Sequence, residues 1–231
     1  MVKAVLMDID DTILSFQGYV RESMMGGFEA FGIGPYQEEM LAVFHRINAE
    51  LWHRLEEGTL SFETLKEIRW NLIFEALGIK ADGVAFEAYF RDRLFDSAIL
   101  VEGAAELLEY LKKKYILCAA SNGPFLQQKN RLKRGGILDC FDHLFISEEI
   151  GFSKPSRAYF DCCLHRLNEK SPQRILPEEV VIIGDSSTSD LAGGIGAGLK
   201  TVYFNPQNRP LPQGMKADYT VETLDQIRAF L

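Results

Sequence analysis

The chain has 231 residues, of which 47% are hydrophobic, and this allows a substantial buried core in one large domain or in a domain with a smaller second one. Its 33 acidic and 25 basic residues give a formal net charge of -8, and no run of Lys and Arg is long enough to follow a nucleic-acid backbone. No segment approaches the roughly 20 apolar residues that span a membrane, and the N-terminus lacks the apolar part of a signal peptide. We therefore expect a cytoplasmic protein, a monomer or weak homodimer, with no nucleic-acid or membrane partner.

Short apolar runs alternate with segments of helical pattern along most of the chain. The runs are 3–7, 115–120, 143–146, 179–184 and 200–204. This alternation predicts an α/β fold, a Rossmann-like, doubly wound parallel sheet with helices on both faces. Each run ends in polar or glycine-rich sequence, and in open α/β sheets ligands bind beyond the carboxyl ends of the strands. We therefore expect the chemistry at these strand ends.

The interval 16–99 breaks this alternation, because its pattern is helical throughout. Apolar residues recur at helical spacing in two stretches, Met40, Phe44, Ile47, Leu51 and Leu55, then Leu65, Ile68, Leu72 and Ala76. Gly32 and Gly78 stand where a left-handed residue would end a helix. We predict four helices, near 20–31, 37–57, 61–77 and 83–95. They would form a helical domain of four-helix-bundle type, inserted into a core domain made of residues 1–15 and 100–231.

Four short motifs follow one another at predicted strand ends or helix starts. They are DIDDT (8–12), SNG (121–123), KP (154–155) and GDSSTSD (184–190). Asp8, Asp185 and Asp190 come from two different strands, and carboxylate oxygens are the ligands that a hard divalent cation such as Mg²⁺ takes. Isolated buried charges are costly, so a bound cation would also explain why so many carboxylates gather at the edge of a core.

The remaining motifs supply groups for an anion. Ser121 and the backbone amides around Asn122 and Gly123 are suitable donors, and Lys154 adds a positive charge at a helix start whose dipole also favours anions. The implied ligand is a phosphoryl group bridged to magnesium. Each motif alone could be an ordinary turn or helix cap, but four of them in order make that reading improbable.

The motifs resemble those of the haloacid dehalogenase superfamily, D-x-D-x-T, S/T, K and G-D-x-x-x-x-D, in the same order across the whole chain. The resemblance implies that Asp8 is the nucleophile, forming an aspartyl-phosphate, and that Asp10 is the general acid and base. Dehalogenases lack an acidic residue at the position of Asp10, so Asp10 favours phosphoryl transfer. The insert between the first two motifs resembles the helical type 1 cap of this superfamily.

The resemblance also implies roles for the other motif residues. Those that would serve the phosphate or its loop are Thr12, Ser121, Asn122 and Lys154. Mg²⁺, the implied cofactor, would be held by Asp8, Asp185 and the backbone carbonyl of Asp10. Asp190 would complete the acidic cluster through water or through Lys154.

Three stretches are similar to bacterial nucleotidases that hydrolyse pyrimidine nucleoside monophosphates. They are LWHRLEEGTLSFETLKEIRW, LFISEEIGFSKPSRAYFD and GDSSTSDLAGGIGAGLKTVYFN. The resemblance implies a phosphomonoesterase for a small phosphate ester, in the first place a 5'-nucleotidase. Alternatives are a phosphatase for phosphoglycolate or a sugar phosphate, a sugar phosphomutase, and a catalytically idle binding module.

A base-binding cap would present aromatic rings for stacking and amide or guanidinium groups for base edges. The candidates are Phe16, Asn48, Trp52 and Arg69. Aromatic residues at helical spacing are more often core residues, so packing is the stronger expectation for Phe16 and Trp52. Arg69 could equally belong to an ion pair.

Overall fold

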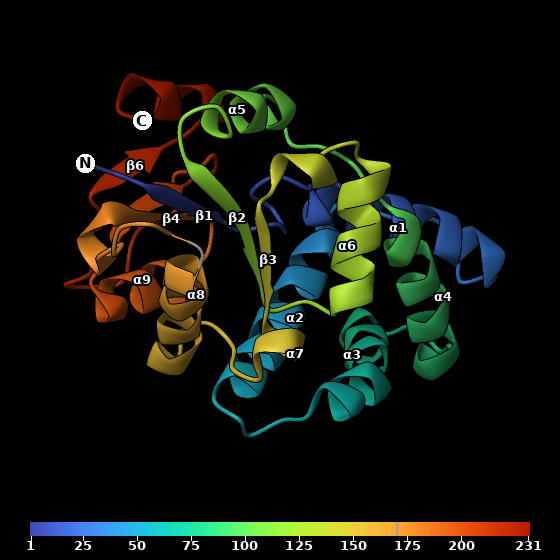
Figure 1. Cartoon of the computed structure of the whole chain (residues 1–231). Coiled ribbons are helices and arrows are strands. Elements are labelled where there is room, and N and C mark those ends of the chain that lie inside the picture. Colours follow the sequence, from blue (N-terminus) through green and yellow to red (C-terminus); the bar gives the residue numbers. More distant parts are fainter. Residues whose placement is uncertain (170) are drawn as a thin grey trace. The chain divides into compact units, whose positions relative to one another are not determined.

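The computed structural model describes residues 1–169 and 171–231, and in these ranges the chain forms two compact units (Figure 1). The first unit contains Met1–Ser15 and Ala98–Leu231, and the second contains Phe16–Ser97. The sequence places the second junction between residues 99 and 100, whereas the structure assigns Ala98 and Ile99 to the first unit. In the ranges described, no helix is both long and apolar enough to cross a membrane.

The first unit is built on a parallel sheet. In the described part of the chain the sheet has six strands in the order β3-β2-β1-β4-β5-β6, and every neighbouring pair is parallel. The strands are β1 (Ala4–Met7), β2 (Ile116–Ser121), β3 (His143–Ile146), β4 (Val180–Gly184), β5 (Lys200–Phe204) and β6 (Tyr219–Val221). The predicted Rossmann-like fold is confirmed. Only β6 was not predicted, because two of its three side chains are exposed and it carries no apolar run.

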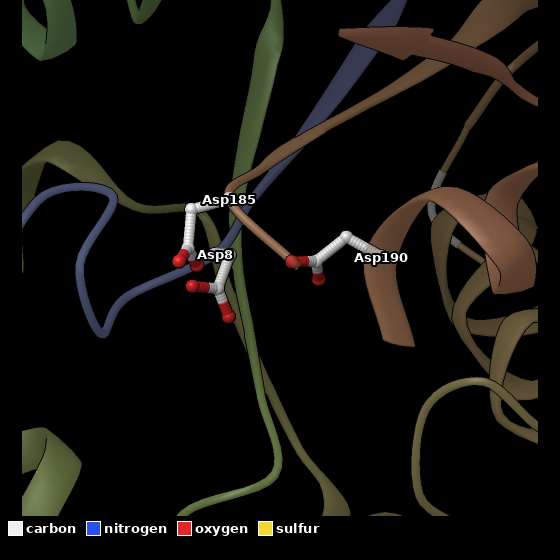
Figure 2. A group of neighbouring side chains, drawn as sticks. All are labelled: Asp8, Asp185 and Asp190. Atoms are coloured by element: carbon white, nitrogen blue, oxygen red, sulfur yellow. The ribbon is translucent and has the colours of Figure 1, made fainter. Parts of the chain in front are cut away.

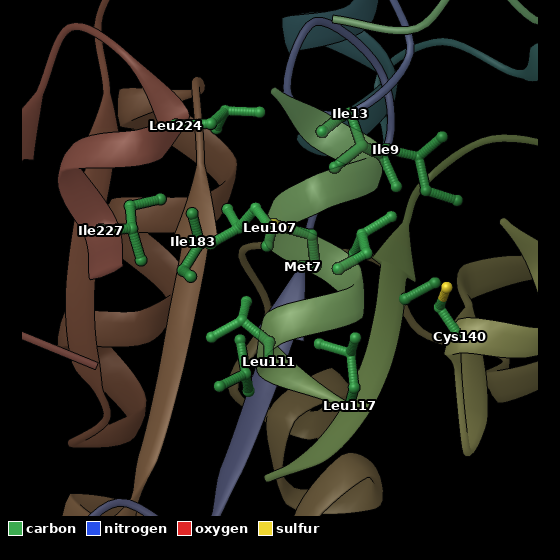
Figure 3. Packing of buried hydrophobic residues seen from close by; sticks show 14 of the residues in the cluster. Met7, Ile9, Ile13, Leu107, Leu111, Leu117, Cys140, Ile183, Leu224 and Ile227 are labelled. Atoms are coloured by element: carbon green, nitrogen blue, oxygen red, sulfur yellow. The ribbon is translucent and has the colours of Figure 1, made fainter. Parts of the chain in front are cut away.

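Helices pack against both faces of this sheet. They are α5 (Ala104–Leu111), α6 (Phe125–Arg134), α7 (Ser147–Ile150), α8 (Arg157–Glu169) and α9 (Ala192–Ala197). Val5 and Met7 of β1 belong to the same buried cluster as Leu107 and Leu111 of α5, part of which Figure 3 shows. The alternate strand residues belong to a second cluster with α8 and α9. Because successive strand residues point to opposite faces, the short apolar runs are buried on both sides.

The strand order determines where a site can form. The chain runs from β1 to β2 and β3 on one side and then crosses to β4 on the other, so the order reverses beside β1. β1 ends at Met7, β2 at Ser121 and β4 at Gly184, and these three strands are neighbours. Asp8, Ser121 and Asp185, which belong to three of the four motifs, therefore gather at one edge of the sheet.

The second unit consists of α1 (Phe16–Ala30), α2 (Glu39–Glu56), α3 (Phe62–Leu77) and α4 (Gly83–Asp96), which match the four predicted helices. Gly32 and Gly78 have φ values of 63° and 68°, in the left-handed region. The residue after each glycine donates its N–H back into the preceding helix, from Ile33 to Phe28 and from Ile79 to Phe74. These bonds satisfy carbonyls that the helix end leaves open, so the predicted glycine caps are confirmed.

The buried face of α3 agrees with the predicted one at Leu65 and differs from it in the second half of the helix. Leu72 is 37% exposed and Ala76 is also exposed. The residues of α3 that are buried are Leu65, Arg69, Trp70, Ile73 and Phe74. The ring centroid of Trp70 lies 4.4 Å from that of Phe86, on α4. Large aromatic side chains gain most from burial, so they rotate α3 away from the face that the aliphatic spacing predicts.

Candidate active site

Asp8 follows directly after β1, and its side chain is buried. Its Oδ1 accepts a hydrogen bond from Lys154 Nζ at 2.6 Å, and its Oδ2 accepts one from Thr12 Oγ1 at 3.2 Å. Its backbone N–H donates to the carbonyl of Ile183 on β4 at 2.9 Å. Donors from separate segments therefore orient both oxygens of this carboxylate.

Lys154 is 1% exposed, and its ammonium group makes three hydrogen bonds. Besides Asp8, it donates to Asp190 Oδ1 at 2.7 Å and to the carbonyl of Ala120 at 2.8 Å. The side chain of Asn122 bonds the backbone of Lys154, and the contact expected between the Asn122 segment and a phosphate stays a prediction. Asn122 Nδ2 donates to the Lys154 carbonyl at 2.8 Å, and its Oδ1 accepts from the Lys154 N–H at 2.9 Å. The side chain of Asn122 thus holds the lysine in place.

Asp190 is 1% exposed and lies in a short π-helical turn, Ser187–Leu191. Its Oδ1 bonds Lys154, as expected, and its Oδ2 accepts from the backbone N–H of Ser186 at 3.1 Å. A Cβ atom on Gly184 would lie 2.2 Å from Asp190 Oδ2, so only glycine fits at the end of β4. The glycine of the last motif therefore admits its final carboxylate.

Asp8, Asp185 and Asp190 each offer a carboxylate oxygen, and these oxygens lie within 4.8 Å of one another (Figure 2). Such a set of oxygen donors fits a hard divalent cation, and the nearby Lys154 balances only part of its negative charge. The carboxylate of Asp10 is outside this set, since its oxygens accept hydrogen bonds from Gln128 and Arg131. This leaves the backbone carbonyl, the atom that we expected, as the means by which Asp10 could contribute to a metal site.

The titration of this cluster reflects its burial. Burial raises the pKa of Asp8 to about 7, and repulsion from Asp190 adds to the effect, although Lys154 opposes it. Burial and the charges of Asp8 and Asp11 raise the pKa of Asp185 well above its usual range. Burial alone would lower the pKa of Lys154, but Asp190 and Asp8 outweigh it and raise that pKa. A bound cation would stabilise the ionised form of these carboxylates and so lower their raised pKa values. The donor set therefore fits a metal in its electrostatics as well as in its geometry.

Two residues at this site were missed by the sequence analysis, Gln128 and Arg131 on α6. Arg131 Nη1 donates to Asp10 Oδ1 at 2.5 Å, and Gln128 Nε2 donates to Asp10 Oδ2 at 2.6 Å. The same Nε2 lies 2.8 Å from Ser121 Oγ, which also accepts from the N–H of Gly123 at 3.0 Å. The available signal was the spacing of three residues, which places both side chains on one helix face just after the SNG motif. Gln and Arg are so common on helix surfaces that this spacing did not single them out.

Within the helical unit, the candidates for base contact take part in local packing. Arg69 Nη2 pairs with Glu87 Oε1 at 2.6 Å, both side chains are buried, and Arg69 Nη1 donates to Asn48 Oδ1 at 3.1 Å. The ring of Trp52 lies 6.1 Å from that of Phe62, and the ring of Phe16 lies 6.1 Å from that of Phe44. Arg69 therefore links α2, α3 and α4. Contact of any of the four candidates with a base stays a prediction.

Comparison with known proteins agrees with this geometry. The family model for haloacid dehalogenase-like hydrolases matches residues 2–198. YfnB of Bacillus subtilis is 32% identical over 225 residues, which cover 97% of this chain and 93% of YfnB. The crystal structure of YfnB bound to magnesium has a TM-score of 0.88 and 33% identity, and covers 100% of this chain and 98% of that one.

Two further relatives are named as pyrimidine 5'-nucleotidases. YjjG of Escherichia coli is 28% identical, covering 98% of this chain and 96% of that protein. PynA of Streptococcus pneumoniae is 30% identical, covering 89% of this chain and 85% of that protein. These matches confirm the resemblance to the pyrimidine nucleotidase group. The chain belongs to the haloacid dehalogenase-like hydrolases.

Proposed function

We propose that this hydrolase is a magnesium-dependent phosphomonoesterase that acts through an aspartyl-phosphate, with nucleoside 5'-monophosphates as its substrates. The observation that carries the proposal is the pair of carboxylates in the first motif, which have different surroundings. Asp8 is buried between Lys154 and the other carboxylates of the cluster, whereas the side chain of Asp10 is 34% exposed and lies beside Ser121 and α6.

In the first step, an oxygen of Asp8 forms a bond to phosphorus while the bond between phosphorus and the ester oxygen breaks. Asp10 donates a proton to that departing oxygen, so the product leaves as an alcohol. Lys154 and Thr12 keep the Asp8 carboxylate oriented for attack. Mg²⁺ held by Asp8 and Asp185 would offset the negative charge of the carboxylates and of the phosphoryl oxygens.

In the second step, a water oxygen forms a bond to phosphorus and Asp10 takes up the proton of that water. The bond between phosphorus and the Asp8 oxygen breaks, which releases inorganic phosphate and regenerates the carboxylate. Ser121 accepts hydrogen bonds from Gly123 and Gln128, and it donates none to an acceptor in the ranges described. Its O–H is therefore suited to a phosphoryl oxygen.

Asp10 supports phosphoryl transfer over dehalogenation, because a halide leaves as a stable anion and needs no proton. Support for nucleotide substrates comes from the pyrimidine 5'-nucleotidases YjjG and PynA, which match this chain over most of its length.

A phosphate-release assay across a panel of substrates tests the proposal. The panel contains pyrimidine and purine nucleoside 5'-monophosphates, sugar phosphates and phosphoglycolate, each with Mg²⁺ and with EDTA. We expect the highest kcat/KM for pyrimidine nucleoside 5'-monophosphates and loss of turnover in EDTA. A preference for sugar phosphates or phosphoglycolate would refute the nucleotidase assignment. Isomerisation of a sugar phosphate without phosphate release would identify a mutase, and inactivity on every ester would refute the phosphatase.

A further inference from the structure

Both carboxylate oxygens of Asp10 are held by side chains of one helix, α6. Arg131 bonds Oδ1 and Gln128 bonds Oδ2, and Arg131 Nη1 also donates to Gln128 Oε1 at 3.0 Å. Three groups thus form a closed set of hydrogen bonds, in which each oxygen of Asp10 has its own donor. Because Gln128 Nε2 also lies within hydrogen-bond distance of Ser121 Oγ, the set relates the position of Asp10 to that of Ser121.

The burial of these two helix residues is unusual for their types. Arg131 and Gln128 are both 0% exposed, although Arg and Gln are mostly found at protein surfaces. A buried guanidinium is costly unless it is paired, and the partner here is a carboxylate whose side chain is 34% exposed. The chain therefore buries a cation and an amide next to a partly exposed carboxylate, and the amide also bonds Ser121.

The backbone at Gly123 leaves room for the side chain of Gln128. A Cβ atom on Gly123 would lie 2.6 Å from Gln128 Nε2 and 3.0 Å from its Cδ. A contact of 2.6 Å is too short for a Cβ atom, so a side chain at position 123 would displace the amide that bonds Asp10 and Ser121. The glycine of the SNG motif thus admits Gln128.

We propose that Gln128 and Arg131 are positioning residues for the reaction. They hold the carboxylate of Asp10 by both oxygens, at a fixed place relative to Ser121, so that it meets the oxygen of the leaving group. The inference rests on the proposed function, because it assigns these residues to the proton transfer that Asp10 would perform there. Gln128 and Arg131 would thus act on the reaction through Asp10, from α6.

The test compares leaving groups that differ in their need for a proton. An alkyl phosphate, such as a nucleoside 5'-monophosphate, requires protonation of its leaving oxygen, whereas p-nitrophenyl phosphate releases a stable anion. For Arg131→Met and Gln128→Met we expect kcat/KM to fall about 10- to 100-fold with the alkyl phosphate and less than about 3-fold with p-nitrophenyl phosphate. The ratio of the two values is the readout, since a misfolded fraction lowers both equally. An unchanged ratio would overturn the proposal.

Three controls sharpen this result. Lys133→Met removes an exposed cation from the same helix and should leave the ratio unchanged. Arg131→Lys keeps a cation that can reach one oxygen of Asp10, so it should recover part of the loss. Arg131→Met in an Asp10→Asn background should cause no further loss with the alkyl phosphate, because the arginine acts through Asp10. A full additional loss in that background would contradict the positioning role.

A crystal structure of Gln128→Met provides a readout without activity. We expect the Asp10 side chain to move from its wild-type position, and an unmoved Asp10 would overturn the proposal. The two proposals can fail separately. A wild-type protein that hydrolyses other alkyl phosphates but no nucleotide refutes the substrate assignment, and the leaving-group ratio still decides the role of Gln128 and Arg131. If no ester is hydrolysed, the proposed function fails. The position of Asp10 in the crystal structure of Gln128→Met then decides whether Gln128 holds this carboxylate in place.

Discussion

The first motif places three carboxylates within four positions, and their surroundings separate them. Asp8 is buried against Lys154 and Thr12, and Asp10 is bonded to Arg131 and Gln128. Asp11 has a φ of 57°, and its backbone N–H donates to the carbonyl of Leu14. The conformation of Asp11 shapes the loop, whereas the other two carboxylates are each held by side chains from distant parts of the chain, and their reacting roles stay proposals.

Replacement of Asp8 by Asn should abolish turnover, because an amide oxygen does not attack phosphorus as a carboxylate does. We expect phosphate release to fall by at least about 10³-fold. Asp11→Asn is the matched control, since Asn adopts positive φ as readily as Asp does, and its activity should stay within about 3-fold of the wild type. Comparable activity in both variants would contradict the nucleophile assignment.

Lys154 is the buried counter-ion of the site, so its removal should affect stability as well as activity. Lys154→Met leaves Asp8 and Asp190 facing each other without their shared cation. In metal-free protein we expect the free energy of unfolding to fall by about 3 to 5 kcal/mol, measured by urea denaturation. The double variant Lys154→Met/Asp190→Asn should regain part of this loss, and strict additivity of the two changes would argue against the charge explanation.

At the scale of the element, the rotation of α3 gives a prediction that separates the observed face from the predicted one. Ile73 is 0% exposed and Leu72 is 37% exposed. Ile73→Ala should therefore lower the free energy of unfolding by about 2 to 4 kcal/mol, and Leu72→Ala by less than about 1 kcal/mol. Thermal or urea unfolding of the two variants measures the difference. A larger loss for Leu72→Ala would favour the face that the aliphatic spacing predicts.

At the scale of the whole molecule, the carboxylate cluster links stability to pH and to magnesium. Burial raises the pKa of Asp8 from 3.8 to about 7 in the folded protein. Between these values the folded state holds a proton that the unfolded state has lost, so the free energy of unfolding falls as the pH rises from about 4 to about 7. The raised pKa of Asp185 acts in the same direction. Magnesium held by the ionised carboxylates, as proposed, should oppose this loss.

The expected measurement is the difference in Tm between protein in Mg²⁺ and protein in EDTA. With Mg²⁺ at about 100 times its Kd, we expect about 5 to 10 °C of stabilisation at pH 8 and much less at pH 5. Asp185→Asn should remove most of this difference, whereas Asp225→Asn, which removes an exposed carboxylate outside the cluster, should preserve it. A difference in Tm that does not grow with pH would contradict linkage through these carboxylates.

Much of the fold followed from local patterns. The apolar runs predicted five of the six strands found in the described ranges, and the glycine signals at Gly32 and Gly78 predicted two helix ends. β6 was missed because a three-residue strand with two exposed side chains leaves no pattern. The face of α3 was predicted correctly at Leu65 and wrongly at Leu72 and Ala76, because its burial depends on the aromatic rings of α4 and helical spacing alone does not report the partner of a helix.

The sequence by itself determined which residues gather at the strand ends, because the order of four motifs along the chain and the rules for parallel sheets bring Asp8, Asp185 and Lys154 to one edge. Only the tertiary structure decided how the second carboxylate, Asp10, is held. Gln128 and Arg131 are more than a hundred residues from Asp10 along the chain, and their three-residue spacing on a helix does not single them out. Their contact depends on the approach of α6 to Ser121, at the end of β2, and on the space that Gly123 leaves, and such long-range fits exist only once the chain has folded.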